Sequence, residues 1–503
     1  MTAPSAYEEL LRRCREESLL SSIAELLEWD ELTHMPEEGA EHRGRQQALL
    51  AGLHHQRATD PRVGDLLDVV ESSELTRDAA SLPAANIRLI RRAYSRARRL
   101  PQALVEEQAR VVSLAQQEWA VARAAADFRI FLPWLEKVVH LKQAEAQAQG
   151  YDSEPYDALL EDYEPGARAA QLAGMFASLR DELLPLIDTI AGARRWPRTD
   201  ILKRNFPIEQ QRLFGEETAA ALGFDFNAGR LDTTVHPFFS AVGPGDCRIV
   251  TRFSDNDFCD GFFGILHELG HAFYEIGLDP EQHGTPAGEA AAVGLHESQA
   301  RLWENAVGRS RAFWRHFLPR AQQTFQASLA DVSLEDFHFA INVCVPSLNR
   351  VRADEVTYNL HILVRFELER ALMSGDLKPA DVPAAWNEGY RRHLGIVPAD
   401  DAEGCLQDGH WGAGLIGYFP TYTLGNLMAA QLFARAAGEL GELEEMFARG
   451  DFAPLLSWLR ERIHRHGHVQ PANDLLEAAT GSPLDHGFLM RYLRGKFGEL
   501  YDV

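Results

Sequence analysis

The sequence contains few cysteines, and none of them belongs to a closely spaced pair. Five cysteines occur among 503 residues, and no Cys-x-x-Cys motif is present. They are Cys14, Cys247, Cys259, Cys344 and Cys405. An odd, scattered set argues against both a disulfide framework and a cysteine-rich zinc site. The pattern therefore predicts reduced thiols and a cytoplasmic protein.

The sequence also lacks long apolar runs and an excess of basic residues. No stretch approaches the roughly 20 apolar residues of a membrane-spanning helix, and the first residues do not read as a signal peptide. Lys and Arg number 50 against 74 Asp and Glu, giving a net charge of -24. Because nucleic acids and anionic membranes bind basic surfaces, we expect neither as a partner. The one dense basic run, Arg88 to Arg99, is interpreted as a helix face that meets acidic groups.

The stretch from Asp260 to Glu275 contains the motif His-Glu-x-x-His. Residues four apart on an α-helix lie on the same face, so His267 and His271 can direct both imidazoles at one ion. Glu268 lies next to the first ligand, where its carboxylate can reach a water molecule bound to that ion. Two core histidines without a metal are the simpler alternative. A third ligand would decide between the two.

A catalytic zinc site needs three protein ligands and one open position. Residues 289–303 predict a second, largely apolar helix that carries Glu297. Carboxylates are rarely buried unless they are paired or bind a metal, so Glu297 is the predicted third ligand. Three other acids lie near the end of the first helix or in the connection: Glu275, Glu281 and Glu289. A third histidine ten residues after the first ligand is excluded, because Gly277 occupies that position.

Helical periodicity dominates the rest of the chain, for example from Tyr7 to Leu27. Residues 104–149 predict long helices with a break near Phe131–Pro133. Segments 231–239 and 246–253 are rich in β-branched and aromatic residues and predict a small β-structure just before the metal-motif helix. Its strand edges could pair with the main chain of a peptide. The irregular, basic stretch 192–206 is the predicted joint between two lobes.

These motifs, taken in order, resemble the carboxypeptidase Taq family of zinc metallopeptidases. The matching segments are 27–36, 156–166, 236–238, 246–248, 260–275, 296–299, 350–362, 404–411 and 417–426. The resemblance implies a mainly α, almost wholly helical two-lobed fold around a deep substrate groove, with the small β-sheet next to the metal helix. We expect one metallocarboxypeptidase unit over residues 1–503. Residues 1–200 would form the amino-terminal lobe that lines the groove, and residues 201–503 the lobe that carries the metal site.

The resemblance also implies an activity and a set of site residues. Members are usually homodimers that release single amino acids from peptides with a free carboxyl terminus. They use Zn²⁺, and Co²⁺ can substitute. The matching positions imply His267, His271 and Glu297 as ligands, Glu268 as the general base, and Arg350 as the residue that binds the terminal carboxylate.

Several further residues are weaker candidates, and packing explains most of them equally well. The expected substrate contacts are His236, Arg248, Gln407, His410 and Tyr422. Tyr422 or His410 is also the candidate donor to the oxyanion that develops during hydrolysis. Asp354 and Glu355 are expected to orient metal ligands through hydrogen bonds.

Three positions depart from the family pattern. Val250 stands where the family has threonine, Asn349 replaces an aliphatic residue, and Arg352 stands where an acid is common. Since the ligand positions are intact, we expect activity to be retained, whereas substrate preference could differ.

Two other functions remain open. A zinc oligopeptidase or a dipeptidyl carboxypeptidase would use the same site. A non-catalytic helical binding protein is the alternative from another class. Glu268 argues against it, because a purely structural zinc takes a fourth protein ligand in place of a base.

Overall fold

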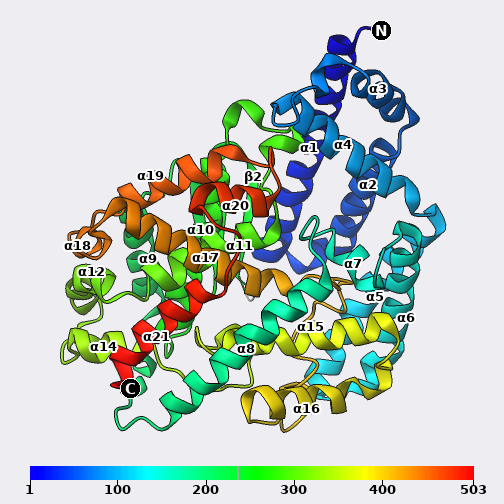
Figure 1. Ribbon diagram of the computed structural model, residues 1–503. Coiled ribbons are helices and arrows are strands. Elements are labelled where there is room, and N and C mark those ends of the chain that lie inside the picture. The colour runs from blue at the N-terminus through cyan, green and yellow to red at the C-terminus, as the bar shows by residue number, and fades with distance from the viewer. Residues whose placement is uncertain (235–236) are drawn as a thin grey trace. The chain divides into compact units, whose positions relative to one another are not determined.

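The computed structural model of the protein describes residues 1–234 and 237–503. Over these ranges most of the chain is α-helical, and the strands form one three-stranded sheet (Figure 1). The expectation of a mainly helical fold with a small sheet beside the metal-motif helix is confirmed. In the described part of the chain, no helix combines the length and apolarity needed to cross a membrane.

The chain divides into two compact units, each built from three segments. The first unit comprises Met1–Arg98, Pro197–Ile341 and Met428–Asp485, and the second comprises Arg99–Trp196, Asn342–Leu427 and His486–Val503. The chain passes from one unit to the other between Trp196 and Pro197 and again at further points along the sequence. The lobes expected over residues 1–200 and 201–503 stay a prediction.

The helices of the first unit contribute to a large core that is rich in aromatic side chains, and the sheet belongs to the same unit. They are α1 (Ala3–Thr33), α2 (Ala40–Ala58), α3 (Pro61–Glu71), α4 (Leu82–Arg99), α9 (Ile208–Leu222), α10 (Phe258–Gly277), α11 (Val293–Arg301), α12 (Arg311–Thr324), α13 (Gln326–Leu329), α14 (Leu334–Ile341), α18 (Leu443–Ala448), α19 (Ala453–Arg462) and α20 (Ala472–Thr480). α4 contains the basic run, and its Arg91 pairs with Asp68 and Glu71 of α3. That pairing agrees with the interpretation of the run as a helix face that meets acidic groups.

The second unit is helical throughout its described secondary structure. Its helices are α5 (Gln102–Ala125), α6 (Phe128–Gln149), α7 (Pro155–Leu160), α8 (Ala169–Ala191), α15 (Tyr358–Ser374), α16 (Val382–Leu394) and α21 (Gly487–Tyr501). One further helix, α17 (Pro420–Leu440), contains the boundary between Leu427 and Met428.

The expected break near Phe131–Pro133 was wrong by several residues. The chain leaves the helical conformation at Ala126, whose φ is 51°, and Asp127 then caps α6 by accepting a hydrogen bond from the Arg129 amide. Pro133 lies inside α6. It is tolerated there because only one helical hydrogen bond is lost near the start of a long helix. The capping residue, rather than the proline, decides where the helix begins.

The sheet consists of β1 (Gly229–Thr233), β2 (Phe238–Gly243) and β3 (Asp246–Thr251) in the order β1-β3-β2. The first expected β-segment is therefore two strands rather than one. Pro237, which has no N–H to donate, separates them in the sequence. β3 is central and pairs in parallel with β1 and antiparallel with β2. β3 also packs against α10, so the sheet lies beside the metal-motif helix.

Candidate active site

The helix α10 holds the His-Glu-x-x-His motif rigidly. Asp257 begins the helix by accepting hydrogen bonds from the amides of Cys259 and Asp260. One face of α10 is apolar and packs into the aromatic core, where Phe258 and Phe262 contact Trp314. Because this face fixes the rotation of the helix, the direction of the motif side chains is fixed as well.

Gly270 lets α11 approach α10 closely at the level of the motif. A Cβ atom at Gly270 would lie 2.5 Å from backbone atoms of Gln299 and Ala300. Those residues follow Glu297 on α11. The two helices lie side by side (Figure 1), and the missing side chain at position 270 brings Glu297 to the histidines.

The structure brings His267, His271 and Glu297 together. One ligand atom from each lies within 4.8 Å of the other two. Oε2 of Glu297 is 3.7 Å from Nε2 of His267 and 3.6 Å from Nε2 of His271. Two imidazole nitrogens and one carboxylate oxygen form a donor set suited to a divalent transition-metal ion. The residues therefore fit the metal that the motif predicts.

The opposite nitrogen of His267 is held by a carboxylate. Nδ1 of His267 lies 3.0 Å from Oε2 of Glu304, which also accepts from Nη1 of Arg301 at 3.2 Å. Burial alone would raise the pKa of Glu304, but Arg301 and His267 outweigh it and hold that pKa below its ordinary value. The Glu304 carboxylate therefore stays ionised and accepts from Nδ1–H. When the His267 ring is neutral, this bond leaves its lone pair on Nε2, which faces Glu297.

His271 has a neutral ring, which is the form that binds metals. Burial, followed by the neighbouring His296, holds the pKa of His271 well below its ordinary value. Phe239 of β2 lies at a centroid distance of 6.2 Å from the ring of His271. The sheet therefore contributes a wall to the metal-motif region.

Glu268 is 7% exposed and adjoins the first histidine on α10. Burial raises the pKa of Glu268 to about 7. A nearby cation would lower it again, because opposite charge favours the ionised form. A carboxylate whose pKa is near neutrality is suited to both accepting and donating a proton.

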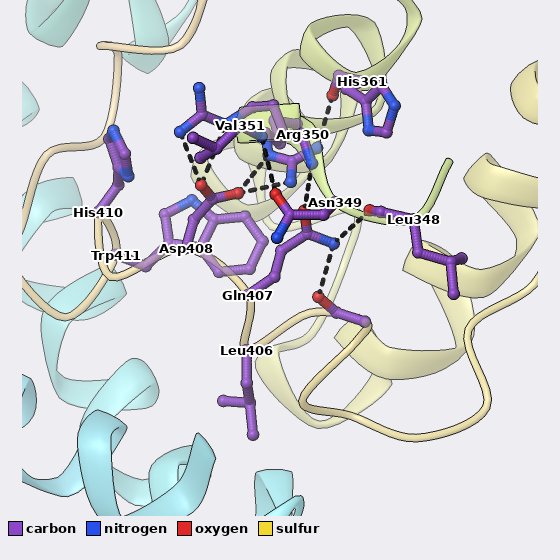
Figure 2. A network of polar contacts seen from close by, with 12 residues as sticks. Leu348, Asn349, Arg350, Val351, His361, Leu406, Gln407, Asp408, His410 and Trp411 are labelled. Carbon is purple, nitrogen blue, oxygen red and sulfur yellow. Dashed lines mark hydrogen bonds and ion pairs between the residues drawn. The ribbon is translucent and has the colours of Figure 1, made fainter. Parts of the chain in front are cut away.

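Arg350 is buried in the second unit and bonded to an acid. Its Nε and Nη2 donate to Oδ1 of Asp408 at 3.0 and 2.8 Å, and Nη1 donates to the hydroxyl of Tyr358 at 3.0 Å. Figure 2 shows the Asp408 carboxylate facing the guanidinium of Arg350. The other oxygen of Asp408 accepts from Nε of Arg365 at 2.7 Å. One buried carboxylate thus serves two buried guanidinium groups.

Three other candidates lie in the same network. Gln407 accepts from the backbone amide of Arg350 at 3.1 Å and donates to the carbonyl of Leu348 at 3.0 Å (Figure 2). Nε2 of His410 is 3.2 Å from the hydroxyl of Tyr422, whose ring lies 4.8 Å from Cζ of Arg350. The structure therefore gathers these residues around Arg350.

The remaining candidates lie elsewhere. Arg248 on β3 pairs with Asp246 and stacks 4.0 Å above the ring of Trp29. Asp354 accepts from the amides of Val356 and Thr357 just before α15. His236 lies outside the described residues.

Glu355 and two of the residues that depart from the family pattern, Val250 and Asn349, have defined surroundings in the structure. Glu355 pairs with Lys496 and accepts from Tyr492. Val250 is fully buried on β3, whereas Asn349 accepts from the amide of Val351 through its side chain. These contacts give Glu355 and Asn349 structural partners within the second unit.

Glu304 and Arg301 were not predicted from the sequence; Glu304 bonds to His267, and Arg301 bonds to Glu297. A signal was present, since Glu297, Arg301 and Glu304 are spaced by four and three residues in an apolar segment. This spacing predicts one charged stripe on a buried helix. The stripe continues past α11 into a π-helical segment, Leu302–Val307. Arg365 was also missed.

Comparison with known proteins agrees with the family resemblance that the sequence motifs indicated. Residues 9–497 match the model of the carboxypeptidase Taq (M32) metallopeptidase family. The chain is 52% identical to thermostable carboxypeptidase 1 of Thermus thermophilus over 510 residues, covering 100% of both proteins. It is 36% identical to carboxypeptidase 1 of Bacillus subtilis, covering 99% of each.

A solved structure shows the same fold. The crystal structure of the M32 carboxypeptidase from Deinococcus radiodurans superimposes with a TM-score of 0.95 at 42% identity, covering 99% of this chain and 100% of that one. A family match over nearly the whole sequence and a relative above 50% identity lead to one conclusion. The chain belongs to the carboxypeptidase Taq family of metallopeptidases and is a metallocarboxypeptidase.

Proposed function

We propose that the protein releases single amino acids from the carboxyl terminus of peptides, with Zn²⁺ held by His267, His271 and Glu297 and with Glu268 as the general base. One observation carries the proposal. Three ligand atoms from two helices converge within 4.8 Å of one another, and a buried carboxylate adjoins them. Co²⁺ is expected to substitute, because it accepts the same donor set.

The chemistry follows from the roles of these side chains. When bound, a divalent cation would acidify a water molecule and polarise the scissile carbonyl. Glu268 accepts the proton of that water molecule and passes it to the departing amine. Three protein ligands, rather than four, are what a catalytic ion would need in order to keep a position open for water or substrate. Tyr422 or His410 remains the candidate donor to the developing oxyanion.

Arg350 is proposed to bind the terminal carboxylate of the substrate. The support is the charge of its surroundings. Arg350 and Arg365 share one anionic partner, Asp408, and burial lowers the pKa of His410 to about 4, so that its ring is neutral near pH 7. Together, the two arginines, Asp408 and the neutral His410 therefore carry one net positive charge. A carboxylate would balance it through charge-assisted hydrogen bonds.

The remaining contacts of the proposed substrate site are Gln407, Arg248 and His236. Gln407 is supported by its bond to the Arg350 amide. Arg248 and His236 rest on the family resemblance alone, as do Asp354 and Glu355 in the orientation of ligands. A homodimer is proposed on the same ground. The five cysteines are free thiols, which supports a reducing, cytoplasmic location.

A product ladder tests the proposed activity. The metal-reconstituted protein is incubated with a peptide mixture, and the products are followed by mass spectrometry. Successive losses of single residues from the carboxyl end are expected, and amidated peptides should be cut at least ten-fold more slowly. Internal cuts would identify an oligopeptidase, and loss of residues in pairs a dipeptidyl carboxypeptidase.

The role of Glu268 is tested by Glu268→Gln. The amide keeps the shape but cannot accept the proton, so kcat should fall about 100- to 10,000-fold. Zinc content should stay at the wild-type level. Glu281→Gln, at an exposed position after α10, is the control. Unchanged hydrolysis in Glu268→Gln would favour the non-catalytic binding protein.

A further inference from the structure

The metal ligand His271 contacts a second histidine through its other ring nitrogen. Nδ1 of His271 lies 2.6 Å from Nδ1 of His296. Two nitrogens at this distance share one proton, since one ring must donate and the other accept. Which ring donates decides whether Nε2 of His271 carries a proton or a lone pair, and only a lone pair can bind a metal.

An acid at the far side of His296 settles that choice. Nε2 of His296 is 2.9 Å from Oε1 of Glu275. When the Glu275 carboxylate accepts this hydrogen bond, Nε2 of His296 is the donor, and in a singly protonated ring Nδ1 then carries the lone pair. His271 must then donate from Nδ1, which leaves its own lone pair on Nε2. That atom is the one that faces Glu297.

The three residues are held in place by their elements. His271 and Glu275 are four residues apart on α10, and His296 on α11 lies between them. Two aromatic rings contact the imidazole of His296: Tyr274 at a centroid distance of 5.1 Å and Phe239 at 6.3 Å. Tyr274 is fully buried. These ring contacts, together with the separate partners of its two nitrogens, hold the His296 ring in one orientation.

We propose that Glu275 and His296 are positioning residues that fix His271 in the tautomer presenting Nε2 to the metal and thereby set metal affinity. The inference rests on the proposed function, because it takes His271 as a ligand. The two ligand histidines differ in this respect. His267 is oriented by direct contact with a carboxylate, Glu304, whereas His271 is oriented through an intervening imidazole.

The variants distinguish the role of His296 as a hydrogen-bond acceptor for His271 from the role of its ring in packing. His296→Phe keeps an aromatic ring that can contact Tyr274 and Phe239 but removes the acceptor. His296→Asn replaces the acceptor with a side-chain oxygen and has no tautomer to set. Glu275→Gln keeps the shape but can donate as well as accept, so it no longer imposes one tautomer on His296. Exposed residues of the connection after α10 supply the controls, His283→Phe and Glu281→Gln.

The readout is the affinity of the metal-free, full-length protein for Zn²⁺, measured by competition with a chelating indicator. Far-ultraviolet circular dichroism checks that each variant is folded. We expect His296→Phe to weaken binding about 10- to 100-fold, the usual effect of losing a hydrogen-bond partner of a metal ligand. His296→Asn should remain close to wild type. Glu275→Gln should weaken binding in the wild-type background and have no effect in His296→Asn.

Two results would overturn the inference. Wild-type affinity in His296→Phe would show that another acceptor holds His271; the backbone of His296 also acts on that ring. Equal losses in the Phe and Asn variants would show that the ring serves packing alone. Failure of the proposed function would be a separate result. In that case the wild-type protein would bind no zinc, or would bind zinc equally well after the His267→Gln substitution.

Discussion

Arg301 donates from Nε to Oε1 of Glu297 at 2.7 Å, four residues along the same helix. The bond occupies one carboxylate oxygen and leaves Oε2 as the atom nearest both ligand histidines. Through Nη1 the same guanidinium reaches Glu304, which holds His267. The guanidinium of Arg301 therefore bonds both to Glu297 and to Glu304, the carboxylate that holds His267.

Replacing Arg301 with lysine should weaken metal binding. An ammonium group keeps the charge but lacks the planar fork that serves two carboxylates at once. We expect about ten-fold lower zinc affinity in Arg301→Lys, measured by chelator competition. Arg311→Lys, at a half-exposed arginine that pairs with Glu335, is the control. Equal affinities in the two variants would show that Glu297 holds its position without this bond.

The close approach of α10 and α11 at Gly270 leads to a second prediction about zinc affinity. In Gly270→Ala the new methyl group meets the backbone of α11, which cannot move aside as a flexible side chain would. The helices should separate, lowering both zinc affinity and the midpoint of thermal unfolding. Overpacking of this kind costs about 1–3 kcal/mol.

Gly52→Ala in α2 is the matched control, because a Cβ there meets no atom within 4 Å. It should be neutral or stabilising by up to about 1 kcal/mol, since alanine favours a helix more than glycine does. A Gly270→Ala variant that behaves like Gly52→Ala would contradict the proposed role of the close approach.

Glu369 should make stability depend on pH near neutrality. It is fully buried in α15 and accepts from Tyr156, Trp411 and the amide of Gly417. Burial outweighs these bonds and raises the pKa of Glu369 from 4.5 to about 7. Between these values the folded state keeps a proton that the unfolded state releases. The free energy of unfolding therefore falls as pH rises from about 4.5 to 7 and levels off above that range.

The change attributable to Glu369 is on the order of 2–3 kcal/mol. Glu369→Gln should remove this pH dependence. The free energy of unfolding of the variant should therefore rise relative to that of the wild type between pH 5 and pH 7.5. Denaturation midpoints at both pH values measure this shift. Glu388→Gln on α16, at an exposed position, should show none. A difference that is constant with pH would mean that Glu369 is ionised in the folded protein at pH 5.

Asp408 is expected to matter for stability as well as for substrate binding. Asp408→Asn would leave Arg350 and Arg365 buried without a counter-charge. Breaking a buried ion pair by removing one partner costs about 3–5 kcal/mol. The thermal midpoint should fall by several degrees, whereas the exposed Asp376→Asn should leave it unchanged. A stable Asp408→Asn variant would indicate that another acid, such as Glu369, compensates the two arginines.

Local pattern in the sequence was enough to predict that His267, His271 and Glu297 come together. The four-residue spacing of His267 and His271 acts through the helical period, which depends only on neighbouring residues. Glu297 could be chosen because a lone acid on an apolar helix needs a partner. The existence of most helices followed from the same periodicity. Their ends did not, as the start of α6 at Asp127 rather than at Pro133 illustrates.

The tertiary structure alone decided which side chains bond to those ligands. Arg301, Glu304 and His296 act through particular atoms whose directions depend on the close approach of α10 and α11 at Gly270. Asp408 and Arg365 are 43 residues apart in the sequence and meet only after folding. Spacing along one helix is short-range information, whereas the partner of a buried charge is selected by packing between distant segments, where an unpaired charge is costly.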